Sequence, residues 1–162
     1  MFEVWVLFEF LDYLYLYRKA TIVIDRFPKK FVISIDGYTM DLYYEKRYEG
    51  WAANATPDFT IEKDGELKVI MDAKNWFEPK NEAIYKMLGY LNNLDVSTGV
   101  LFFPNDMFLE PKLLIRGTNL KNHINQCLVN CVLWPSGSAK AVAEKKKNLG
   151  ILVKTIIETL SS

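Results

Sequence analysis

Hydrophobic and polar residues alternate along residues 58–74, on both sides of an Asp64-Gly65 turn signal. Before the turn, the apolar residues are the odd-numbered ones of residues 59–61. After the turn, they are the odd-numbered ones of residues 67–73, and Ile70 is the one apolar residue at an even position. Alternation with a period of two is typical of a strand with one buried face, and Asp-Gly favours a tight hairpin turn. The pattern predicts a β-hairpin with one apolar face.

The length of the turn decides whether the two apolar rows share that face. A two-residue loop would pair Lys63 with Glu66 and send the rows to opposite faces, because side chains alternate along a strand. A three-residue loop, with Gly65 as a left-handed bulge residue, pairs Glu62 with Glu66 and puts both rows on one face. We therefore predict the three-residue loop.

The polar face of this hairpin brings two acids together. In the predicted register Asp58 lies opposite Ile70, Asp72 is its diagonal neighbour, and Lys74 follows on the same side. Diagonal neighbours are roughly 7–8 Å apart at Cα, a gap that two carboxylates can close around a shared cation. Asp is rare in strands, and two converging carboxylates repel unless a cation or a proton intervenes. The alternative interpretation is the solvated outer face of an ordinary hairpin.

The rest of the chain predicts a single mixed α/β domain. The expected helices cover residues 2–19, 80–93 and 139–160; the expected strands cover 20–25, 31–36, 39–47, 100–103 and 122–134; the expected loops cover 49–56 and 75–79, with another around Pro111 and Gly117. Residues 2–19 are apolar nearly all round, so we expect this helix to be buried. In the terminal helix, Val142 and Leu149 are among the residues expected to face inward.

The first helix carries two acids that a buried helix would hold at a cost. Glu3 and Glu9 are six residues apart, about 240° around the axis, so they cannot serve one site together. Glu9 lies in the body of the helix, whereas Glu3 lies near its end, where helices fray.

Charge does not mark the chain as a nucleic-acid-binding protein. Its 162 residues have 20 basic and 20 acidic side chains, so any affinity for DNA must come from local patches. The candidate patches are Arg18-Lys19, Arg26 with Lys29-Lys30, Lys46-Arg47 and Lys145-Lys146-Lys147. Tyrosines 13, 15, 17, 43, 44 and 48 are either stacking platforms for bases or core residues.

No apolar stretch reaches the roughly 20 residues of a membrane span, because Glu9 and Asp12 interrupt residues 4–17. We expect a cytoplasmic protein without membrane contact. Its two cysteines, Cys127 and Cys131, form an i, i+4, i+8 series with His123 that a helix would align. A strand over residues 127–134 is the preferred interpretation, and three ligands would in any case make an incomplete structural zinc site.

The motifs occur in an order that resembles the PD-(D/E)XK nucleases. Pro57-Asp58, a hairpin, Asp72-Ala73-Lys74 and then a helix with Lys86 and Tyr90 are similar to the signature of that superfamily. A closer resemblance is to McrC-like nuclease subunits of restriction systems, and it covers roughly residues 2–104. It includes Phe2-Glu3-Val4-Trp5-Val6, Lys86-Met87-Leu88-Gly89-Tyr90 and the apolar run ending at Pro104, with Lys86 where the McrC-like pattern has Gln.

This resemblance implies a restriction-endonuclease-like αβββαβ core, with a mixed central sheet flanked by helices. It implies Mg²⁺ or Mn²⁺ held by Asp58, Asp72, the Ala73 carbonyl and Glu3, which the family register favours over Glu9. Lys74 would orient or deprotonate the attacking water, and Lys86 and Tyr90 would contact a phosphate.

The expected function is metal-dependent cleavage of DNA, alone, as a homodimer or within a larger restriction or DNA-processing complex. Two alternatives stay open. One is an inactive nucleic-acid-binding or assembly subunit on the same fold, and the other is a dimer that resembles the Holliday-junction resolvases.

Overall fold

The computed structural model describes residues 1–74, 80–104, 112–115 and 126–162. In these ranges the helices are α1 (Phe2–Arg18), α2 (Lys80–Leu94) and α3 (Ala139–Ser161), and the strands are β1 (Thr21–Arg26), β2 (Lys30–Ile35), β3 (Tyr38–Tyr44), β4 (Tyr48–Glu49), β5 (Asn54–Ala55), β6 (Phe59–Lys63), β7 (Glu66–Ala73), β8 (Thr98–Phe103), β9 (Lys112–Ile115) and β10 (Gln126–Val132).

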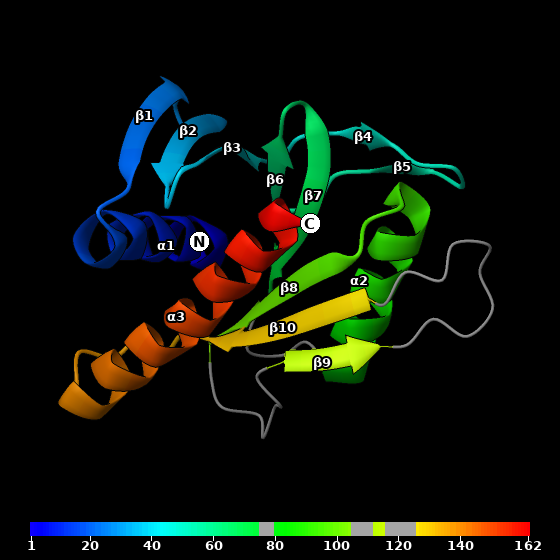
Figure 1. Cartoon of the computed structure of the whole chain (residues 1–162). Helices are drawn as coiled ribbons and strands as arrows, with labels where there is room; N and C mark the ends of the chain where they lie inside the picture. Colours follow the sequence, from blue (N-terminus) through cyan, green and yellow to red (C-terminus); the bar gives the residue numbers. More distant parts are fainter. Residues whose placement is uncertain (75–79, 105–111, 116–125) are drawn as a thin grey trace.

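Eight of these strands form one mixed sheet in the order β1-β2-β3-β6-β7-β8-β10-β9. The strands from β1 to β7 pair antiparallel, β7, β8 and β10 pair parallel, and β9 runs antiparallel along β10. Helices α1 and α3 lie on one face of the sheet and α2 lies on the other (Figure 1). The predicted mixed α/β architecture, with a large central sheet flanked by helices, is confirmed.

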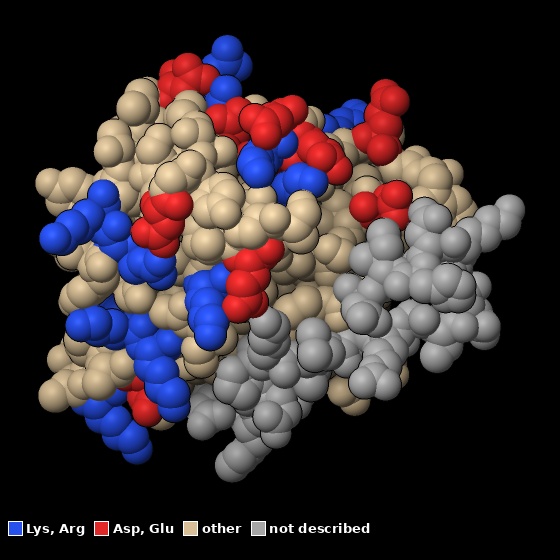
Figure 2. All heavy atoms as spheres, viewed as in Figure 1, with Lys and Arg blue, Asp and Glu red and all other residues tan. Residues whose placement is uncertain are grey.

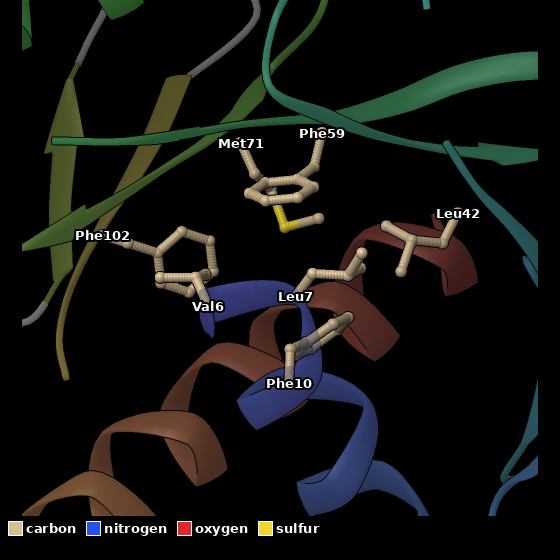
Figure 3. A pocket seen from close by; sticks show the side chains of 7 residues that line it. All are labelled: Val6, Leu7, Phe10, Leu42, Phe59, Met71 and Phe102. Carbon is tan, nitrogen blue, oxygen red and sulfur yellow. The ribbon is translucent and has the colours of Figure 1, made fainter. Parts of the chain in front are cut away.

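Each face of the sheet has its own apolar core. On the α1 side, Val6, Leu7 and Phe10 of the helix meet strand residues such as Phe59 and Met71 (Figure 3), and no space for a water molecule is left between them. On the α2 side, the buried residues are Ile70, Ala83, Met87, Leu91, Val96, Leu101, Phe103 and Leu128. Because α1 and α3 cover one face of β7 and α2 covers the other, the C-terminal half of that strand is enclosed.

Helix α1 is less buried than its composition predicts. Val4, Phe8 and Leu16 are 40%, 44% and 64% exposed, because only the stripe that includes Leu7 and Phe10 faces the sheet. The prediction for Val142 in α3 was also wrong, since this residue is 41% exposed, whereas Leu149 is buried. Apolar side chains thus remain on the outer surface of both helices.

The predicted loop of the β6–β7 hairpin was wrong, although both apolar rows do share a face. Lys63 pairs with Glu66 across the two-residue turn Asp64-Gly65, and the register then shifts so that Ile61 pairs with Val69. Asp64 and Gly65 both have positive φ, 53° and 78°, as a type I′ turn requires. The extra residue sits in β7 instead of the turn.

That extra residue is Lys68, which lies between the pairs Glu62↔Leu67 and Ile61↔Val69. A bulge of one residue restores the odd-to-odd pairing that a three-residue loop would have given. Beyond it, Phe59 pairs with Met71, two residues away from the predicted partner.

A small arm precedes Asp58 and is attached to α2. Strands β4 and β5, in the segment predicted as a loop, pair as a separate two-stranded sheet. The Asn93 carboxamide accepts from Ala52 N at 2.9 Å and Ala53 N at 3.2 Å, and donates to Ala53 O at 2.7 Å. Gly50 packs so closely that a Cβ there would lie 2.1 Å from Asn93 Nδ2.

Three further predictions concern the second half of the chain. Strand β9 occupies part of the segment predicted as a loop, and Cys127 and Cys131 lie on strand β10, as preferred. The loop at 75–79, Pro111, Gly117, His123 and the start of the strand at 122 lie outside the described residues. None of the described helices is long and apolar enough to cross a membrane.

The basic and acidic side chains, which are equal in number, gather in separate patches on the surface (Figure 2). Figure 2 shows basic side chains gathered over the N-terminal half of α3, at the lower left, and acidic side chains predominating along the top of the view. Local fields therefore differ across the surface although the total charge is zero.

Candidate active site

Asp58 and Asp72 meet at the open end of the β6–β7 hairpin. Because Phe59 pairs with Met71, the next position in this register sets Asp58 opposite Asp72 instead of diagonal to it. The Asp58 Oδ2 accepts a hydrogen bond of 2.7 Å from the backbone N–H of Ala73. Asp72 is only 3% exposed.

The surroundings of Asp58 favour its protonated form. The pKa of Asp58 is raised to about 7, first by burial and then by the negative charge of Asp72, while the bond from Ala73 N–H acts in the opposite direction. Partly buried carboxylates of like charge hold a proton or a cation more readily than exposed ones. The hairpin end therefore favours a positive charge between these side chains.

Lys74 supplies one positive charge from within the protein. Its side chain is 2% exposed and its Nζ forms an ion pair with Asp72 Oδ2. Its backbone N–H donates to Phe102 O at 2.8 Å, which anchors the end of β7 to β8. A buried lysine keeps its charge only beside a compensating group, and here that group is the Asp72 carboxylate.

Helix α2 brings a second lysine to the same carboxylate. Lys86 Nζ lies 3.7 Å from Asp72 Oδ2, and its side chain is half exposed. The same ammonium lies 5.6 Å from the centre of the Tyr90 ring, one helical turn further along. Both residues predicted from this helix thus lie at the edge of the site, with Lys86 between the acids and solvent.

The two candidate acids of α1 lie in different surroundings. Glu9 pairs with Lys145 of α3 at 2.6 Å, away from the hairpin end. The Glu3 carboxylate lies 3.2 Å from the N-terminal amine and contributes to the raised pKa of Asp58. Glu3 is therefore the helix acid on the side of the site, although it does not join the two aspartates as a third ligand.

The donor set fits a hard divalent cation. Asp58 and Asp72 offer two carboxylates, and among the described residues no third His, Cys, Asp or Glu completes a metal-binding group. Mg²⁺ is commonly held by one or two carboxylates and keeps several waters. The two aspartates and the neighbouring Ala73 peptide meet that requirement.

A buried polar network beside the acids was not anticipated from the sequence. Glu62, 6% exposed, accepts from Tyr48 Oη at 2.7 Å and from Lys46 Nζ at 2.5 Å. Tyr48 Oη also lies 2.7 Å from Thr60 Oγ1, and Thr60 is fully buried. The polar face of β6 is therefore covered by residues 46–48 and is not solvated. The sequence feature that could have indicated this network is the high density of tyrosine and lysine residues in residues 43–48.

Together these features define a mixed α/β protein with two carboxylates and a buried lysine at the end of a central hairpin. No protein-family model matches the chain, and no curated protein matches it. Among solved structures it is similar, with a TM-score of 0.45 and 12% identity, to a chain of a Thermococcus gammatolerans complex described as McrB AAA+ hexamers with bound McrC. The match covers 93% of this chain and 32% of the other, so this protein spans about a third of it.

Proposed function

We propose that this protein is a metal-dependent endonuclease that hydrolyses DNA phosphodiester bonds, on a restriction-endonuclease-like core of the McrC-like kind. The observation that carries the proposal is the convergence of Asp58, Asp72 and Lys74 at one hairpin end, with Lys86 facing them from α2. Phosphodiester hydrolysis requires compensation of negative charge and an activated water, and this group of side chains suits both tasks. The order of motifs in the sequence supports the same proposal.

Each residue has a distinct role in this proposal. Asp58, Asp72 and the Ala73 carbonyl hold Mg²⁺ or Mn²⁺, which would supply Lewis-acid stabilisation of the phosphoryl oxygens and lower the pKa of a bound water. Lys74 orients the attacking water or removes its proton. Lys86 and Tyr90 contact the phosphate from the solvent side. Glu3 adds negative charge near the site.

The direct test is cleavage of supercoiled, linear and four-way-junction DNA with Mg²⁺, Mn²⁺, Ca²⁺ or EDTA. We expect cleavage with Mg²⁺ or Mn²⁺, and a rate at least about 100-fold lower for Asp72→Asn. Asp64→Asn is the matched control, because Asp64 lies in the same hairpin, is exposed and has a φ that Asn tolerates. This control should cleave like the wild type.

Three outcomes separate the proposal from its alternatives. Intact DNA of every form, combined with no heat of Mg²⁺ binding in calorimetry, would overturn the proposal in favour of an inactive binding subunit. Equal activity of Asp72→Asn and Asp64→Asn would place the chemistry elsewhere. Cutting of the four-way junction far faster than linear duplex would identify a resolvase-type activity at the same residues.

A further inference from the structure

A cleft of about 590 Å³ opens where the β1–β2 turn meets the end of β3. Its lining consists of four basic side chains, two acidic ones and two tyrosines: Arg26, Lys29, Lys30, Lys46, Asp25, Glu45, Tyr43 and Tyr44. This volume is in the range of small-molecule binding sites. Basic residues outnumber acidic ones among these lining residues, while Asp41 pairs with Lys30 and Glu62 pairs with Lys46 from outside the lining.

Side chains of the protein itself hold the lysines of this cleft in place. Lys46 Nζ lies 3.9 Å from the centre of the Tyr43 ring, and Lys30 Nζ lies 5.5 Å from the same ring. Lys29 Nζ lies 5.0 Å from the centre of the Tyr44 ring and 2.8 Å from Glu45 Oε2. Such contacts limit the freedom of long side chains, so less entropy is lost when an anion binds.

Arg26 differs from the three lysines. No acidic side chain of the described residues forms an ion pair with its guanidinium, and the residue is exposed. A guanidinium presents several N–H donors in a plane that matches two phosphate oxygens. The cleft therefore combines one arginine outside these ion pairs with three lysines that carboxylates hold in position.

Two residues of the cleft lining are neighbours of Asp58. Glu45 N donates to Asp58 O at 2.8 Å, and Tyr44 pairs with Phe59, the residue after Asp58. Burial raises the pKa of the Tyr44 phenol, with the negative charges of Glu45, Glu3 and Asp58 adding to the effect. Tyr44 and Glu45 thus place one side of the cleft beside Asp58.

We propose that this cleft binds the phosphodiester backbone of a DNA strand and leads it to the Asp58–Asp72 site. The delivery to that site rests on the proposed function, whereas the binding of the strand does not require cleavage. The cleft is the part of the protein that holds substrate beyond the scissile phosphate.

The contacts favour recognition of phosphates over bases. Stacking requires a free aromatic face, but lysine ammoniums lie over both tyrosine rings, and Tyr44 also packs on Phe59 with ring centres 5.6 Å apart. Such a site recognises the charge and spacing of the DNA phosphates and does not depend on the base sequence. An abasic strand should therefore bind nearly as well as a strand with bases.

The experiment measures binding of a fluorescein-labelled 20-mer of dT in EDTA by anisotropy, at several salt concentrations. The cleft variant is Arg26→Ala with Lys29→Ala, which removes two exposed charges. The matched control is Lys147→Ala with Lys154→Ala, which removes two exposed charges from α3. Circular dichroism and thermal melting establish that both variants are folded.

We expect micromolar affinity for the wild type and the control, and at least about fivefold weaker binding for the cleft variant. The slope of log K against log salt should fall by roughly 0.7 for each lost phosphate contact. An abasic 20-mer should bind within about threefold of dT. Asp72→Asn should bind like the wild type even though its cleavage is lost.

Two results of the binding experiment would overturn the inference. Equal weakening in the cleft variant and the α3 control would show that only total charge matters, and a large preference for dT over the abasic strand would show base recognition. These failures are distinct from failure of the proposed function. Cleavage without binding in the cleft would overturn only this inference, and binding in the cleft without any cleavage would overturn only the nuclease proposal.

Discussion

Lys74 and Asp72 are nearly inaccessible to water, at 2% and 3% exposure, and form an ion pair. Removing one partner of such a pair leaves a buried charge without compensation, which costs about 3–5 kcal/mol. We predict that Lys74→Met destabilises the protein by about 3 kcal/mol and lowers cleavage at least about 100-fold. Urea unfolding and plasmid cleavage measure the two effects.

A double variant tests the reason for that loss. Lys74→Met combined with Asp72→Asn removes both charges, so at least half of the lost stability should return. Additive losses would contradict the pairing. Lys68→Met, in the same strand, removes an ion pair with the exposed Glu66 and should cost less than about 1 kcal/mol.

The raised pKa of Asp58 predicts that the stability of the metal-free protein depends on pH. Its pKa is about 7 in the folded protein, compared with an ordinary value of 3.8, so the folded state holds the proton more tightly than the unfolded state. The free energy of unfolding should therefore fall as pH rises from about 4 to about 7 and level off above, by at most about 4 kcal/mol. Urea midpoints in EDTA across this range measure it.

Asp58→Asn supplies the comparison for this prediction. The amide does not titrate, so the difference in stability between wild type and variant should change between about pH 4 and pH 7 and stay constant above. A constant difference across the whole range would contradict the raised pKa. Mg²⁺ binds the ionised carboxylate, so its stabilising effect should increase over the same interval.

At the level of elements, the bulge at Lys68 accommodates one extra residue in β7 without changing the faces of the strand beyond it. Removing Lys68 would leave Glu62 with Leu67 and Ile61 with Val69 as consecutive pairs, so the strand beyond keeps its faces. We predict that deletion of Lys68 leaves the protein folded and active. Deletion of Ile70 should instead turn Asp72 to the opposite face and abolish both metal binding and cleavage. Calorimetry and plasmid cleavage distinguish the two deletions.

The hairpin also illustrates what the sequence could and could not predict. The odd-to-odd parity correctly placed the apolar rows on one face. Parity repeats every two residues, so it cannot distinguish a three-residue loop from a two-residue loop with a bulge at Lys68. The two solutions differ in the partner of Asp58, Ile70 in one and Asp72 in the other, and side-chain packing in three dimensions decides between them.

The other helices and strands show the same limit. The three helices and the strands of the central sheet other than β9 follow from periodicity, and the sequence motifs indicate Asp58, Asp72, Lys74 and Lys86 as site residues. The contacts of Glu62 with Lys46 and Tyr48 are 14 to 16 residues apart in the chain and have no local periodic signature. Strand β9 has only four residues, too few for alternation to mark it.

At the level of the whole molecule, the arm before Asp58 is held by the end of α2. A methyl group at Gly50 would lie 2.1 Å from Asn93 Nδ2 and 2.5 Å from Ala53 O, and backbone atoms cannot move aside cheaply. We predict that Gly50→Ala destabilises the protein by about 1–3 kcal/mol and lowers cleavage, because Asp58 follows the arm. Thermal unfolding and plasmid cleavage are the measurements.

Gly89→Ala is the matched control on α2. A Cβ at Gly89 meets no atom within 4 Å, and alanine is favoured over glycine inside a helix. This variant should therefore be about 0.5–1 kcal/mol more stable than the wild type. Equal melting temperatures for the two alanine variants would contradict the close approach of Gly50 to Asn93.

The position of the bulge makes the hairpin tip a useful place for a reporter group. Asp64 and Gly65 are exposed, and Lys68 lies between them and the acidic end of the hairpin, so residues added at the tip need not alter the pairing of Ile61 with Val69. A short peptide tag inserted between Asp64 and Gly65 should leave cleavage intact. Natural variants of this protein are expected to differ in length at this tip and to keep the spacing from Val69 to Lys74.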